Sequence, residues 1–182
     1  MNEKALELKL LQNPNYSSGW IQNAVPLMAK YSLTEEQLVK YDVEQLQLIT
    51  AMFAEEEKGY DILVDEFLNP ALNATQMQLL LTGYSKGLTT EQLRPFFNPE
   101  IPYVKSNWYI TALIEGIDLT DYDINAYDMN QIYEIYAGKK DGVDVSVYNK
   151  VDVPAEKMAI AHHALAMGLK VQFDENKKLT IY

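Results

Sequence analysis

Few residues in this sequence have the types and spacing that enzymes use. The two histidines, His162 and His163, are adjacent, so on a helix they point to different faces and make no metal-binding pair. The chain has no cysteine, which excludes disulfides, thiolate metal sites and a cysteine nucleophile. It has no glycine-rich phosphate loop and no serine nucleophile turn, and nothing selects a catalytic pair among its 26 acidic residues. The sequence therefore predicts that the protein is not an enzyme and uses no cofactor or metal.

One segment copies part of a calcium-binding loop. Asp121, Asp123 and Asn125 match the first ligand positions of an EF-hand loop. The glycine that such a loop requires is replaced by Ala126, and its bidentate glutamate is replaced by Ile132. Specific calcium binding is therefore not expected.

The same segment has a second interpretation as a contact surface, because carboxylates and tyrosines are interspersed along it. Carboxylates can substitute for phosphates in a basic groove, and tyrosines serve as anchors at interfaces. The alternative is that the aspartates cap helices and are solvated, since Asp118 and Asp128 stand where helix N-caps are expected. The candidate partner-binding residues are Asp118, Asp121, Tyr122, Asp123, Tyr127 and Asp128.

The charge balance restricts the kinds of partner. The net charge is −11, and Arg94 is the only arginine. Arginine and lysine supply the phosphate contacts that dominate nucleic-acid affinity, so direct DNA contact is disfavoured. One weak basic patch remains conceivable, formed by Lys139, Lys140, Lys150 and Lys157. The acidity either keeps the protein soluble or fits a basic partner such as a nucleic-acid-binding protein.

The elements that position these residues follow from evenly spaced glycines. Gly59, Gly87, Gly116, Gly142 and Gly168 are 28, 29, 26 and 26 residues apart, and a further step of 28 residues back reaches Tyr31. Ten residues before each of these positions stands an anchor: Ile21, Ile49, Met77, Ser106, Ile132 and Met158. The residues three and four positions after each anchor are almost all apolar, which is the spacing of one helix face. Each glycine therefore predicts the left-handed end of a helix of about twelve residues.

Small residues six positions after four anchors, namely Gly83, Ala112, Gly138 and Ala164, indicate close approach of a neighbouring element. After each glycine, a short second arm brings an aromatic residue back onto the helix. The predicted fold class is all-α, an α-solenoid-like array of about six helical hairpins in one domain, 1–182. Residues 1–15 form a capping helix, 16–170 form the repeats, and 171–182 form either a small β-hairpin or a frayed tail. No signal peptide or membrane span is expected, which favours the cytoplasm.

The repeat motifs also carry a resemblance. Gln76-Met77 … Gly83 … Gly87-Leu88 and Gln131-Ile132 … Gly138 … Gly142-Val143-Asp144-Val145-Ser146-Val147-Tyr148 resemble a short helical repeat found in proteins of mobile elements of gut Clostridia. Lys157-Met158 … Gly168-Leu169 is similar to the same repeat. The resemblance covers roughly residues 43–173.

Together with length and acidity, this repeat makes the chain similar to type II-A anti-CRISPR proteins, which inhibit Cas9. The resemblance implies a phage or mobile-element protein in the host bacterial cytoplasm that binds the Cas9–guide RNA ribonucleoprotein and blocks DNA cleavage. It would occlude the basic nucleic-acid channel or clamp a mobile lobe, and no binding residue is carried over. The alternative is a generic helical-repeat interaction scaffold, monomeric or weakly self-associating, with an unrelated host partner.

Overall fold

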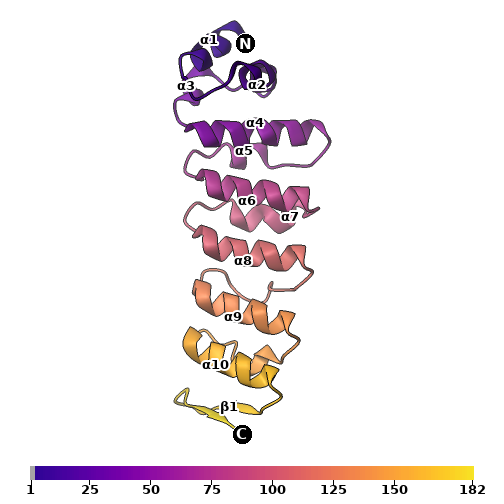
Figure 1. Ribbon diagram of the computed structural model, residues 1–182, viewed down its shortest axis with the longest axis vertical. Coiled ribbons are helices and arrows are strands. Elements are labelled where there is room, and N and C mark those ends of the chain that lie inside the picture. The colour runs from indigo at the N-terminus through magenta and orange to yellow at the C-terminus, as the bar shows by residue number, and fades with distance from the viewer. Residues whose placement is uncertain (1–2) are drawn as a thin grey trace. The chain divides into compact units, whose positions relative to one another are not determined.

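The structure is a computed structural model that describes residues 3–182. It is mostly helical, with a two-stranded sheet at the C-terminal end, as the sequence predicts (Figure 1). The chain divides into two compact units, Met1–Pro99 and Glu100–Tyr182, called unit 1 and unit 2 below and described separately. The prediction of one continuous domain stays a prediction.

Unit 1 alternates long helices with short ones. Its elements are α1 (Glu3–Leu11), α2 (Ser18–Lys30), α3 (Glu35–Leu38), α4 (Val43–Glu57), α5 (Val64–Phe67), α6 (Ala74–Ser85), α7 (Thr90–Leu93) and the 3-10 helix η1 (Arg94–Phe96). Helix α2 packs on α4, and α4 packs on α6. The predicted N-terminal capping helix is α1, which packs on α2; residues 1–2 of that prediction lie outside the described residues.

Unit 2 has the same alternation, but its arms contain less helix. Its elements are α8 (Tyr103–Ile114), α9 (Met129–Lys140), the 3-10 helix η2 (Val145–Val147), α10 (Ala155–Ala166), β1 (Val171–Phe173) and β2 (Leu179–Ile181). Helix α9 packs between α8 and α10. The strands pair antiparallel with Val171 opposite Ile181 and pack on α10, so the C-terminal residues form the β-hairpin rather than a frayed tail.

Three of the long helices, α4, α6 and α9, begin at side-chain caps that the local sequence supplies. Asp42, Asn73 and Asp128 each accept a hydrogen bond from the backbone N–H of a glutamine three residues later. The side-chain oxygen of each glutamine in turn accepts a hydrogen bond from the backbone N–H of its cap residue, which completes the capping box.

The helix ends confirm the glycine prediction at five positions. The five glycines have φ between 73° and 95°, a region that costs a residue without Cβ the least. The prediction of a sixth left-handed helix end, at Tyr31, is wrong by one residue. Tyr31 keeps a φ of −87°, and Ser32 adopts the left-handed conformation at φ 59°. Tyr31 is instead held by stacking on Phe53, at a ring-centroid distance of 4.2 Å.

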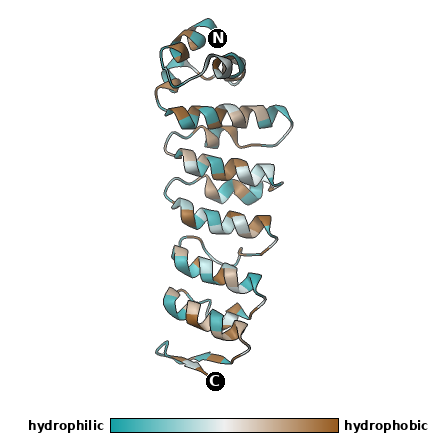
Figure 2. Cartoon of the chain, viewed as in Figure 1, coloured by the Kyte–Doolittle hydropathy of each residue, from teal (hydrophilic) through white to brown (hydrophobic). Residues whose placement is uncertain are grey.

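The core is the stripe of residues around the anchors. All six anchors are buried, and so are the aromatic residues Phe53, Phe67 and Tyr148. Figure 2 shows hydrophilic and hydrophobic residues interleaved along each long helix. Within residues 3–182, no helix has both the length and the apolar character required to cross a membrane.

Candidate binding surfaces

The aspartates of segment 118–128 fold the segment itself. Asp118 accepts hydrogen bonds from the Thr120 N–H (2.9 Å) and hydroxyl (2.6 Å), and these bonds lower the pKa of the Asp118 carboxyl. Asp123 accepts the Asn125 N–H at 2.9 Å, and Asp128 caps α9. These three side chains and Asp121 are all exposed. Capping and turn formation therefore explain three of the four aspartates, while their charge still faces solvent.

The two tyrosines of this segment attach it to the next linker. The Tyr127 hydroxyl donates to the Asn149 carbonyl oxygen at 2.7 Å, and the Asn149 side chain donates to the Tyr122 hydroxyl oxygen at 2.9 Å. The two rings meet edge to face at 5.7 Å, and burial raises the pKa of Tyr127. Tyr122 is only 8% exposed, so its ring is part of the packing and is not available as an anchor for a partner.

Most lysines of the conceivable basic patch have partners within unit 2. Lys139 lies 5.2 Å from the centre of the Tyr122 ring and donates to the Asp118 carbonyl oxygen. Lys140 pairs with Glu115 at 2.9 Å, and Lys157 donates to the Lys177 carbonyl oxygen at 2.5 Å. Glu115 therefore offsets the charge of Lys140, whereas Lys139 and Lys157 are bonded to uncharged carbonyl oxygens.

A surface that sequence reasoning missed lies on the long helices of unit 2. The Trp108 ring of α8 is 4.8 Å from the Tyr133 ring and 5.5 Å from the Tyr136 ring of α9. Val104 and Met129, one turn before Trp108 and Tyr133 respectively, are exposed, and Tyr133 itself is 41% exposed. We call Val104, Trp108, Met129 and Tyr133 the aromatic face. Tryptophan, tyrosine and methionine are the side chains that interfaces favour.

A signal for the aromatic face was present in the sequence. Trp108 lies two residues after the anchor Ser106, and Tyr133 lies one residue after the anchor Ile132. The arm of this unit packs elsewhere on α8, because the Tyr109 hydroxyl donates to the Tyr122 carbonyl oxygen at 2.5 Å. Adjacent helix positions differ by about 100°. The sequence signal is therefore an aromatic residue one or two positions after the anchor in these two helices.

Helix α10 carries a second apolar surface in unit 2. A groove of about 410 Å³ lies between α10 and the hairpin, lined by Ala159, Ile160, His163, Ala164, Met167, Leu169 and Ile181. Met167 is 65% exposed and Ile160 is also exposed, so the groove opens to solvent.

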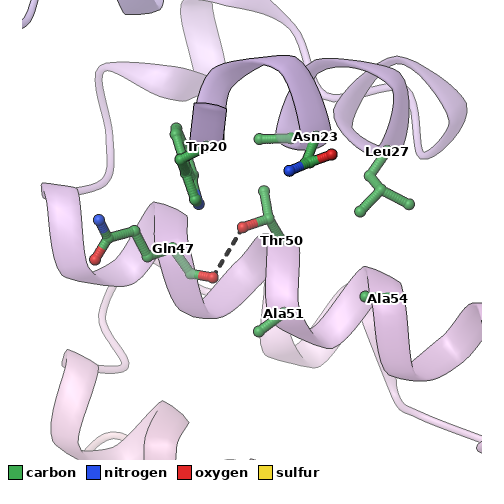
Figure 3. A pocket seen from close by; sticks show the side chains of 8 residues that line it. Trp20, Asn23, Leu27, Gln47, Thr50, Ala51 and Ala54 are labelled. Atoms are coloured by element: carbon green, nitrogen blue, oxygen red, sulfur yellow. Dashed lines mark hydrogen bonds between the residues drawn. The ribbon is translucent and has the colours of Figure 1, made fainter. Parts of the chain in front are cut away.

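Unit 1 has a comparable groove between α2 and α4. Trp20, Asn23 and Leu27 of α2 face Gln47, Thr50, Ala51 and Ala54 of α4 across a volume of about 410 Å³ (Figure 3). The Thr50 hydroxyl donates to the Gln47 carbonyl oxygen at 2.8 Å, so this donor already has an acceptor within the helix. All eight lining residues are uncharged.

The groove between α4 and α6 is also lined mainly by uncharged residues. It shares Gln47 and adds Leu48, Ala74, Thr75 and Gln78, with Glu44 as its one charged lining residue. In a chain of net charge −11, these grooves are depleted of charge. Charge depletion distinguishes the centre of a protein interface from an ordinary solvated surface.

Within residues 3–182, no three His, Asp or Glu side chains are grouped in a way that could hold a metal ion. Ile132, at the position of the EF-hand glutamate, is buried in α9. Comparison of the chain with protein-family models, curated proteins and solved structures found no match.

Proposed function

We propose that this chain is a helical-repeat protein that binds a partner protein stoichiometrically and catalyses no reaction. The observation that carries the proposal is the exposed surface of the long helices, which is apolar and aromatic in unit 2 and nearly uncharged in unit 1. Exposure of apolar side chains to water is unfavourable, and contact with a partner protein would bury them.

Bonds that recur between successive hairpins support the repeat. The buried Gln45 side chain donates to the carbonyl oxygens of Pro70 and Leu72, at the start of the next long helix. Gln131 donates in the same way to Val151 and Val153, at 2.8 Å each. Gln45 and Gln131 are both the third residue after the N-cap of their helices, although Gln45 lies four residues before the anchor Ile49 and Gln131 only one before the anchor Ile132. The capping box thus both starts a helix and ties it to the next one.

The partner that we propose is the Cas9–guide RNA complex, and this part rests on the resemblance to anti-CRISPR proteins. The net charge of −11 fits a large basic protein with a nucleic-acid channel. Two modes follow: the exposed carboxylates at Asp118, Asp121, Asp123 and Asp128 occlude the channel, or the aromatic face clamps a mobile lobe. The second candidate function is an interaction scaffold for an unrelated host protein, favoured by the same exposed surface.

Co-purification with Cas9–guide RNA, followed by DNA cleavage at increasing amounts of this protein, tests the proposal. We expect a stable complex and complete inhibition near equimolar amounts. Absence of a complex together with full cleavage would eliminate Cas9 as the partner, and pull-down from a host lysate would then test the scaffold.

A matched pair of variants tests the surface. Tyr133→Ala removes an aromatic ring that is 41% exposed on the aromatic face, and Tyr60→Ala removes one that is 38% exposed in unit 1. We expect Tyr133→Ala to weaken binding at least tenfold, which corresponds to about 1.4 kcal/mol, and Tyr60→Ala to leave it unchanged. Equal effects of the two variants would remove the aromatic face from the proposal.

A further inference from the structure

Strand β2 has one edge with no strand beside it, since within residues 3–182 it pairs only with β1. At the open end of the hairpin, the backbones of Lys170 and Tyr182 exchange two hydrogen bonds, of 2.8 and 3.0 Å. Bonded and non-bonded pairs alternate along an antiparallel ladder, so the next bonded pair is Gln172 with Thr180. The N–H and carbonyl groups of Thr180 therefore point toward β1, and those of its two neighbours in β2 point away from it.

The residues that carry the outward backbone groups are Leu179 and Ile181, and Ile181 is exposed. Strand β1, by contrast, packs on the 3-10 helix η2 of the preceding arm. Proteins protect an edge strand by placing a charged residue, a proline or a bulge within it, and the Leu-Thr-Ile sequence of β2 contains no charge and no proline. Its register with β1 is regular, without a bulge. The edge is therefore available for pairing with another strand.

An apolar groove borders the same strand. It is the groove of about 410 Å³ described above, in which Ile181 of β2 faces Ile160 and Met167 of α10. Met167 stands directly before the turn glycine of its helical hairpin. The residue at this position is charged in the four earlier hairpins that end at a glycine: Lys58, Lys86, Glu115 and Asp141. The hairpin of α10 thus has an exposed apolar side chain where the others have a solvated charge.

The charges around this edge favour a second copy of the chain as the occupant. Two molecules with a net charge of −11 repel each other, so contact between them is least unfavourable where carboxylates are absent. None of the residues that line the groove is Asp or Glu, and residues 177–182 contain two lysines and no acid. Lys177 pairs with Asp152 at 2.8 Å, and Lys178 is exposed. The edge offers no carboxylate to a basic partner, whereas it suits another acidic molecule.

We propose that two copies of the chain pair through β2 in an antiparallel, two-fold symmetric arrangement centred on Thr180. Leu179 of each copy exchanges both backbone bonds with Ile181 of the other. Thr180 stands opposite Thr180 of the second copy, and threonine pairs across strands are favourable. In the same register, Lys178 stands opposite the exposed ring of Tyr182 in the other copy, and an aromatic ring attracts a cation.

The groove supplies the contact area that a three-residue strand lacks. Ile181 faces α10, and Leu179 lies two residues earlier, so both side chains are on the same face of the hairpin. Pairing brings the same two side chains of the second copy beside the groove, where Ile160 and Met167 are exposed. A short strand with a modest apolar area predicts a dimer that dissociates on dilution. This association does not depend on the identity of any other partner, so it stands apart from the proposed function.

Sedimentation velocity of the full chain at physiological ionic strength, over a range of concentrations, tests the proposal. We expect monomer at low concentration and dimer at high concentration. Thr180→Lys places like charges opposite each other on the two-fold axis, at a position that is exposed in the single chain. Gln172→Lys is the matched control, because Gln172 is the exposed partner of Thr180 in the hairpin and adds the same charge away from the axis. We expect Thr180→Lys to raise the dissociation constant about tenfold or more, and Gln172→Lys to change it by less than about threefold.

Hydrogen exchange of single amides provides a readout in the wild-type chain. The Thr180 amide is bonded within the hairpin, so it should be protected at every concentration. The amides of Leu179 and Ile181 should become protected only as the dimer forms. A chain that stays monomeric at its highest soluble concentration, a dimer in which these two amides remain unprotected, or equal effects of the two lysine variants would each refute pairing through β2.

Discussion

The Tyr148 hydroxyl oxygen lies 1.9 Å from the position that a β-carbon would occupy on Gly138. Tyr148 is completely buried, and its hydroxyl donates to the Glu134 carbonyl oxygen, one turn earlier in α9, at 3.1 Å. The small residue predicted at this position is therefore required by the aromatic side chain of the arm. Gly83 has the same role, since its β-carbon would lie 2.7 Å from Leu93 of α7.

Gly138→Ala should destabilise unit 2. Alanine is favoured over glycine inside a helix by about 1 kcal/mol, but overpacking a buried site costs about 1–3 kcal/mol. The overlap with a ring that cannot move places the cost at the upper end. Chemical denaturation measures the free energy of unfolding.

Two comparisons control for this effect. Tyr148→Phe removes the overlapping oxygen, so it should partly restore Gly138→Ala although it destabilises the wild type by about 1 kcal/mol. Gly83→Ala should cost less than Gly138→Ala, because the Leu93 methyl group that it meets is the end of a flexible side chain. An additive double variant would contradict the steric explanation.

Gln131→Ala should destabilise the protein more than the loss of one ordinary hydrogen bond. Gln131 is 5% exposed, and its removal leaves the buried carbonyl of Val153 without this donor and the backbone of Asp128 without its cap partner. An unsatisfied buried group costs about 1–3 kcal/mol. Asn130→Ala, at the adjacent exposed position, is the control, and hydrogen exchange at the start of α10 would locate the effect.

Replacement of Asp118, Asp121, Asp123 and Asp128 by asparagine distinguishes the two binding modes. Asparagine keeps the caps and turns while removing the charge, so the fold is retained. If the carboxylates occlude a basic channel, binding to Cas9–guide RNA should weaken steeply and lose much of its salt dependence, because exposed charges are screened over about 8 Å at physiological ionic strength. If the aromatic face makes the contact, affinity and salt dependence should change little.

Glu115 gives the stability of unit 2 a pH dependence in the acidic range. Hydrogen bonds from Lys140 and Tyr136 lower the pKa of the Glu115 carboxyl below its ordinary value. A lowered folded-state pKa means stability that is present above the ordinary carboxyl range and is lost as the pH falls through it. Glu115→Gln should therefore flatten the loss of stability between about pH 5 and 3. Glu156→Gln, at an exposed position of α10, should leave that slope unchanged.

The sequence could predict those parts of the fold in which a single residue determines the backbone conformation next to it. Gly142 marks a helix end because only a residue without Cβ adopts its conformation at little cost, and Asp128 marks a helix start because its side chain bonds the next turn. Ser32 was missed because a polar residue can take the left-handed conformation without a glycine to signal it.

The site was harder to predict because its members are separated in sequence. Trp108 and Tyr133 become neighbours only when α8 packs on α9, and neither has a motif around it. The interspersed aspartates and tyrosines of residues 118–128 predict a contact surface, yet Tyr122 within this segment is buried. A local composition bias identifies a segment, whereas the exposure of each side chain depends on the neighbouring hairpin.

The ties between successive hairpins span short stretches of chain. Gln45 reaches Leu72 over 27 residues, Gln131 reaches Val153 over 22, and His162 reaches Glu134 over 28. Chains whose contacts are close in sequence close small loops and reach the native state rapidly. Each hairpin of a unit can therefore dock as soon as the next one has left the ribosome, so the nascent chain exposes little unpaired apolar surface during synthesis.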